Sequence, residues 1–74
     1  MKHMKKDIRK DMIVGRATMS GLDVKRMSAR SGMTLSTMYR RLRLPGTMTL
    51  DELASIDKAV RFTDEEILFL VRCR

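Results

Sequence analysis

The stretch over residues 23–42 (DVKRMSARSGMTLSTMYRRL) limits the possible folds of this chain more than any other feature. It contains two helix starts with a glycine between them. Asp23 and Thr34 are both residue types whose side chains accept hydrogen bonds from the free amides of a helix's first turn. Gly32 lies where the first helix should end, in a position that favours positive φ. The stretch therefore predicts two short helices, 24–31 and 35–44, joined by a tight turn.

The second of these helices is predicted to have two different faces. Met38 and Leu42 lie four residues apart, so they share one stripe that we expect to be buried. Met33 lies five residues before Met38, which is the spacing of a hydrophobic staple. The apolar positions of the preceding helix are Val24, Met27 and Ala29. The outward face of the second helix carries Leu35, Ser36, Tyr39, Arg40 and Arg43.

Apolar residues that recur every four positions predict an earlier helix over residues 4–18, after a basic lead-in at residues 1–6. Gly21 is a natural stop after this helix, and Leu22 should return to the core. Pro45 prevents the helix over 35–44 from continuing, because proline lacks the amide hydrogen and restricts the residue before it.

Two capping boxes predict two further helices. Thr49 with Glu52, and Thr63 with Glu66, have the spacing at which each side chain bonds the other residue's amide. The predicted helices cover residues 49–61 and 64–72.

The last predicted helix contains five consecutive apolar residues, Ile67 to Val71. A helix that is apolar on all sides does not suit the surface of a monomer, so we expect a partner to cover part of it. The residues predicted for this dimer interface are Ile67, Phe69, Leu70 and Val71. A short terminal β-strand over residues 69–71, pairing across a two-fold axis, is an alternative.

Length and charge narrow the function. A chain of 74 residues forms one small domain, 1–74. Residues 1–46 carry 12 Lys or Arg and 3 Asp, a net charge of +9. Residues 47–74 carry 4 basic and 6 acidic residues, a net charge of −2. A domain polarised in this way would attract a polyanion with one side only.

Several other classes of function are not expected. One Cys and one His make neither a disulfide nor a metal site. No combination of nucleophile, acid–base pair and phosphate loop points to an enzyme, a cofactor or a small-molecule substrate. No apolar run approaches the ~18 residues of a membrane span, and the basic N-terminus lacks the apolar stretch of a signal peptide. These features predict a cytoplasmic protein.

The ordered motifs resemble the helix-turn-helix of the lambda-repressor-like family, which includes phage repressors and Cro proteins. The resemblance covers residues 22–68 and lies in Met27-Ser28, Gly32-Met33-Thr34, Ser36 to Leu42, Pro45 and Thr49 to Leu53. It implies a compact, all-α, five-helix domain that regulates transcription as a small Cro-like member, a dimer on a palindromic operator in double-stranded DNA. It also implies phosphate contacts, for which the matching positions are Lys25, Thr37, Arg43, Gly46 and Thr47.

Base reading is expected from the N-terminal turns of the second helix, because a helix-turn-helix places them against base edges in the major groove. The candidates are Leu35, Ser36, Tyr39 and Arg40. Arg40 would fork onto guanine and Leu35 would pack on a thymine methyl, unless it is buried against the preceding helix. The chain has no Asn and no Gln, so the family's amide contacts to adenine have no equivalent here.

Two other functions stay open at the level of the sequence. The apolar C-terminus would suit a protein-binding module, such as an antirepressor or an antitoxin-like partner. The basic half alone would suit a non-specific nucleic-acid binder, although Tyr39 is the one aromatic residue on that side and gives no stacking platform.

Overall fold

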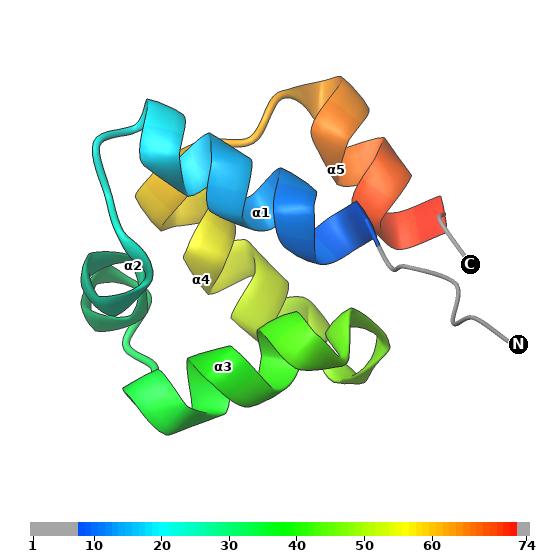
Figure 1. Ribbon diagram of the computed structural model, residues 1–74. Coiled ribbons are helices and arrows are strands. Elements are labelled where there is room, and N and C mark those ends of the chain that lie inside the picture. The colour runs from blue at the N-terminus through cyan, green and yellow to red at the C-terminus, as the bar shows by residue number, and fades with distance from the viewer. Residues whose placement is uncertain (1–7, 73–74) are drawn as a thin grey trace, which may run out of the picture.

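Five α-helices follow one another along residues 8–72, the part of the chain that the computed structural model describes (Figure 1). They are α1 (Ile8–Met19), α2 (Val24–Arg30), α3 (Leu35–Arg43), α4 (Leu50–Val60) and α5 (Asp64–Arg72), with a short 3-10 turn, η1 (Pro45–Thr47), before α4. No strand occurs within this range, so the predicted all-α class is confirmed. The predicted lead-in at 1–6 and the predicted start of the first helix at Met4 lie outside the described residues.

The turns around α2 form as the sequence predicts. The Arg26 amide donates to the Asp23 carboxylate at 2.8 Å, and the Thr37 amide donates to the Thr34 hydroxyl oxygen at 3.2 Å. Gly32 has a φ of 71°, in the left-handed region where a side chain would be strained. The two caps fix where α2 and α3 begin, and Gly32 allows the turn between them.

Both capping boxes are also confirmed. In the first, the Glu52 amide donates to the Thr49 hydroxyl oxygen at 3.0 Å, and the Thr49 amide donates to the Glu52 carboxylate at 2.9 Å. In the second, the Glu66 amide donates to the Thr63 hydroxyl oxygen at 3.1 Å, and the Thr63 amide donates to the Glu66 carboxylate at 2.8 Å. Since α5 is helical from Asp64 to Arg72, the alternative of a terminal strand is wrong.

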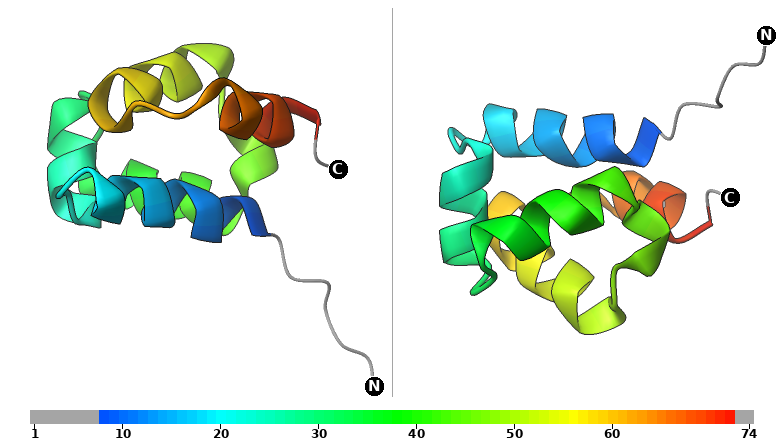
Figure 2. Two further views of the ribbon diagram at one scale, coloured as in Figure 1. Left: turned by 90° about the horizontal axis from the view of Figure 1, so that it is seen from above. Right: turned by 60° about the horizontal axis from the view of Figure 1, so that its bottom comes forward.

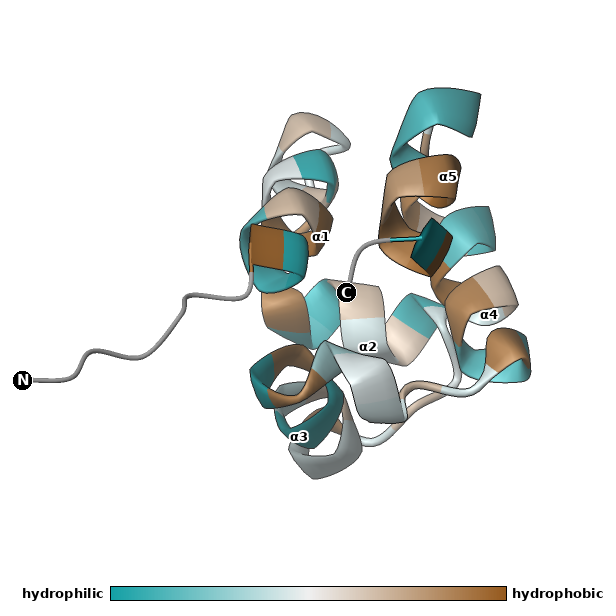
Figure 3. Cartoon of the chain, turned by 90° about the vertical axis from the view of Figure 1, so that its right-hand side faces the viewer, coloured by the Kyte–Doolittle hydropathy of each residue, from teal (hydrophilic) through white to brown (hydrophobic). Residues whose placement is uncertain are grey.

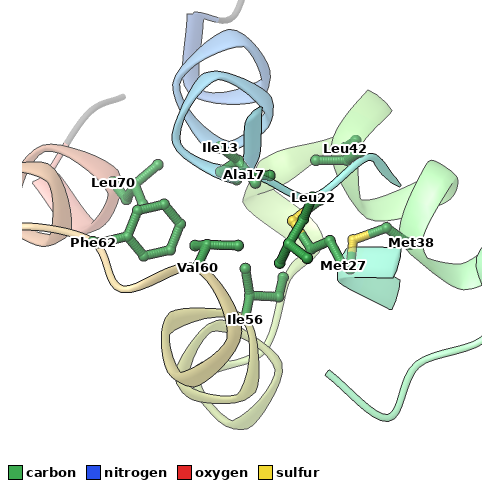
Figure 4. Close-up of a cluster of buried hydrophobic side chains, with 10 residues drawn as sticks. All are labelled: Ile13, Ala17, Leu22, Met27, Met38, Leu42, Ile56, Val60, Phe62 and Leu70. Carbon is green, nitrogen blue, oxygen red and sulfur yellow. The ribbon is translucent and has the colours of Figure 1, made fainter. Parts of the chain in front are cut away.

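The core is built from residues of every helix and of the connections between them (Figure 4). Two residues differ in burial from what the sequence predicts. Ala29 is exposed, because it lies on the side of α2 away from the core residue Met27. Leu70, predicted to lie in a dimer interface, is buried beside Phe62. The buried apolar residues are Ile13, Ala17, Leu22, Met27, Met38, Leu42, Ile56, Val60, Phe62 and Leu70.

α3 crosses one side of the molecule, and no other helix covers its outer side (Figure 2, right). α1, α2, α3 and α4 pack closely on one another, and α2 contacts both α3 and α4. α5 returns along α1, so that the C-terminal end of α5 lies beside the N-terminal end of α1 (Figure 1). The backbone of α5 approaches the other helices less closely than they approach one another.

Candidate nucleic-acid interface

The outer face of α3 gathers most of the predicted DNA-contacting side chains. Ser36, Tyr39, Arg40 and Arg43 line one shallow surface depression, and all four are exposed. Leu35 stands at the N-terminal end of the same helix and is 38% exposed, so it is not buried against α2. Met38 and Leu42 are buried, and helical periodicity therefore places the exposed residues on the opposite face of α3.

An ion pair holds α3 in place in addition to its buried apolar face. The guanidinium of Arg41 donates to the carboxylate of Glu52 at 2.8 Å, which joins α3 to the first turn of α4. The hydrogen bond from Arg41 lowers the pKa of Glu52, and the bond from the Thr49 amide lowers it further. Arg41 therefore positions α3 against α4.

The predicted phosphate residues occupy different surroundings. Lys25 is exposed at the start of α2, where the carboxylate of Asp23 already accepts the Arg26 amide. A phosphate there would meet the Lys25 side chain, but the Arg26 amide is not available to it. The Thr37 hydroxyl oxygen accepts from the Thr34 hydroxyl at 2.9 Å, and Arg40 approaches it at 3.5 Å. Thr37 is half-buried and belongs to the N-cap of α3 more than to its outer face.

In the turn after α3, Gly46 and Thr47 are both predicted to contact phosphate, but only one of them has donors to spare. The amide of Thr47 donates to the Leu44 carbonyl at 2.9 Å, and its hydroxyl donates to the same oxygen at 2.7 Å. Both donors of Thr47 are thus used inside η1. Gly46 is exposed and remains the better placed of the two for an anion.

The charged residues of α2 and α3 are all basic. Together these two helices carry six Lys or Arg and no Asp or Glu. Of these, Arg41 is paired with Glu52, whereas Arg26 and Arg30 add exposed charge on α2 that the sequence did not assign to a partner. The acidic residues lie mostly on α4 and α5. Positive charge is therefore concentrated on α2 and α3, and negative charge on α4 and α5.

A second arginine–glutamate pair stabilises the domain away from α3. Arg16 on α1 donates through Nε and Nη2 to both carboxylate oxygens of Glu66 on α5, at 3.0 and 2.9 Å. This pair lowers the pKa of Glu66, and the hydrogen bond from the Thr63 amide lowers it further. Each capping-box glutamate thus also holds an arginine from another helix.

These pairs predict acid sensitivity. Because the folded-state pKa values of Glu52 and Glu66 lie below the ordinary 4.5, their stabilisation is fully present above that pH and is lost as the pH falls through the lowered values. Glu66→Gln keeps a capping-box residue but loses the ion pair, so we expect its Tm at neutral pH to fall by up to about 5 °C. Below pH 4.5 its melting curve should converge with that of the wild type.

The matched control is Glu65→Gln, which removes the same charge from the same turn of α5 without breaking an ion pair within one chain, so both variants are compared as monomers at low protein concentration. Thermal unfolding followed by circular dichroism between pH 3 and pH 7 gives the comparison. A Glu66→Gln protein with the same acid dependence as Glu65→Gln would show that the Arg16–Glu66 pair does not stabilise the fold.

The described residues contain no group of three His, Cys, Asp or Glu side chains that could hold a metal ion. None of the helices over residues 8–72 is both long and apolar enough to cross a membrane. Comparison of the chain with protein-family models, with curated proteins and with solved structures finds no match.

Proposed function

We propose that this chain is a sequence-specific regulator of transcription that binds double-stranded DNA through α3 in the major groove. One observation carries the proposal: Ser36, Tyr39, Arg40 and Arg43 share one exposed depression on a helix whose opposite face is fixed in the core. A helix of this width fits the major groove of B-DNA. The fixed inner face would keep the outer side chains in register with the base pairs.

Arg40 would carry most of the base discrimination. Its guanidinium has the forked donor geometry that pairs with O6 and N7 of guanine, a contact worth roughly 1–3 kcal/mol against another base. Leu35 would pack on a thymine methyl, Ser36 would donate or accept at a base edge, and Tyr39 would reach a phosphate or a base edge. Since the chain has no Asn or Gln, the operator should be marked by guanine and thymine contacts more than by adenine amide contacts.

The basic side chains around this face would supply affinity for the backbone. Lys25 and Arg43 are exposed and would contact phosphates, and the amide of the exposed Gly46 would add a further phosphate contact. One module of this size gives modest affinity, so we propose a Cro-like dimer on two half-sites about 34 Å apart, working in the cytoplasm as phage regulators of this kind do. α2 then supports the recognition helix and adds charge through Arg26 and Arg30.

A second candidate function has one observation in its favour. Leu50, Leu68 and Val71 are exposed apolar residues on α4 and α5. A patch of this kind would suit a protein-binding module of the antirepressor or antitoxin-like type. In that case α3 would have no role in base reading.

The deciding experiment is a titration of the protein against its own upstream DNA and against a scrambled duplex, across a salt series. Log affinity should fall with log salt by about 0.9 for each phosphate contacted, with either duplex. A preference of roughly a thousandfold or more for one palindromic site is the expected result. Equal binding to both duplexes would leave a charge-driven binder. Stoichiometric binding to another protein with no DNA footprint would favour the second candidate.

A further inference from the structure

An apolar groove runs between α4 and α5. Most of its lining residues are aliphatic, and the two polar ones are Asp57 and Asp64. Three of the lining residues are strongly exposed, with Leu50 at 78%, Leu68 at 49% and Val71 at 54%. Figure 3 shows the hydrophobic segments of α4 and α5 on one flank, with α3 on a different side of the molecule. The other lining residues are Leu53, Ala54 and Ile67.

α5 is only partly attached to the rest of the domain. Leu70 and Ile67 pack on the core, and Glu66 is held by Arg16, so the inner side of the helix is accounted for. Its backbone otherwise lies farther from the other helices than they lie from one another. The outer side of α5 therefore presents apolar surface that the monomer does not use.

The charges on this outer side have a pattern. Glu65, Leu68 and Arg72 are all exposed and recur at intervals of three and four residues, so they form one stripe along α5. Glu65 and Arg72 are about 10 Å apart along the helix axis, too far to pair with each other. Within residues 8–72 neither of them forms an ion pair. The stripe thus has an acidic end, an apolar centre and a basic end.

The charges of this stripe are complementary to those of an identical stripe that runs in the opposite direction. Rotation of a second copy by 180° about an axis near Leu68 brings the two α5 helices together antiparallel. Each Glu65 then faces the partner's Arg72, and the two Leu68 side chains meet at the axis. An interface with this symmetry is isologous, so one stripe supplies both charge pairs.

We propose that the α4–α5 groove and the outer stripe of α5 form the two-fold interface of a homodimer, with Glu65 opposite the partner's Arg72. Leu50 and Val71 become buried beside the central leucines. This inference assigns an interface to the dimer of the proposed function. It rests on the proposed function only in expecting that dimer to bind DNA. It keeps Ile67 and Val71 of the interface predicted from the sequence, leaves out Leu70, which is buried in the core, and adds the exposed Leu50 and Leu68.

The test is a charge exchange followed by sedimentation equilibrium without DNA, over a concentration series. The wild type should dimerise. Glu65→Arg and Arg72→Glu each place like charges opposite one another, so each should weaken dimerisation by about tenfold or more. The double variant restores opposite charges and should recover most of the lost affinity. Because the two residues do not pair within one chain, recovery would require contact between copies.

Two further variants keep the test independent of folding. Reversed charges at the ends of α5 oppose its dipole, so circular dichroism should first show that each variant is folded. Leu68→Ala keeps helix propensity and should also weaken the dimer, whereas Arg26→Glu on α2 should leave it unchanged. Single variants that dimerise like the wild type, or a double variant that fails to recover, would overturn the proposed interface.

The DNA titration separates this inference from the proposed function. A protein that stays monomeric yet prefers one duplex would refute the interface and leave the function standing. A dimer that responds to the charge exchange but shows no preference between duplexes would refute the function and leave the interface standing. Capture of the groove by a different protein, with no self-association, would also overturn the homodimer.

Discussion

Leu42→Ala is expected to lower the free energy of unfolding by about 2–5 kcal/mol, because it leaves a cavity where α3 meets the core. Leu42 is 1% exposed and belongs to the same cluster as Met38 and Ile13. A domain of this length has a total stability of roughly 4–11 kcal/mol, so the loss is a large part of it. The Tm should fall by more than about 10 °C.

Leu44→Ala is the matched control for this experiment. It makes the same chemical change two residues later, at a side chain that is 54% exposed. We expect a change of less than about 0.5 kcal/mol there. Urea unfolding of both variants gives the comparison, and equal losses would mean that α3 is not anchored through Leu42.

Arg40→Ala is expected to reduce discrimination at one base pair of each half-site by roughly 5- to 160-fold, the equivalent of the 1–3 kcal/mol of a bidentate guanine contact. The guanidinium lies on the exposed face of α3, within 3.5 Å of the Thr37 hydroxyl oxygen. Its removal should leave the fold intact, because within residues 8–72 it contributes to neither the core nor an ion pair. Binding to a panel of duplexes with single substitutions measures the effect.

Arg43→Ala should give a different result on the same panel. Arg43 lies further along α3, where a side chain would reach phosphate more readily than a base edge. Its loss should weaken binding to all duplexes about equally and reduce the salt slope by about 1. If Arg40→Ala left the ranking of the duplexes unchanged, Arg40 would not read a base.

The helix boundaries could be predicted because the signals that set them are local. The caps at Asp23, Thr34 and Thr49 each join a side chain to an amide three residues away. Such bonds form within one turn, so residue type and spacing are enough to predict them. The inward and outward faces of α3 follow in the same way, since helical periodicity alone separates Met38 from Tyr39.

What the sequence left undetermined depends on residues that are far apart in the chain. The Arg41–Glu52 and Arg16–Glu66 pairs join residues 11 and 50 positions apart, and nothing in their local sequence selects these partners. The interface candidates on α5 show the same limit. Five consecutive apolar residues do not reveal which one turns inward, and only the packing of α5 on Phe62 and α1 assigned Leu70 to the core.

The sequence by itself therefore determined the five helices, their caps and the exposed face of α3, because each depends on contacts within about one helical turn. The tertiary structure decided which arginine positions α3 and which apolar side chains remain uncovered. These properties depend on how helices pack, since a charge or an apolar surface becomes paired or buried only when a distant segment arrives beside it.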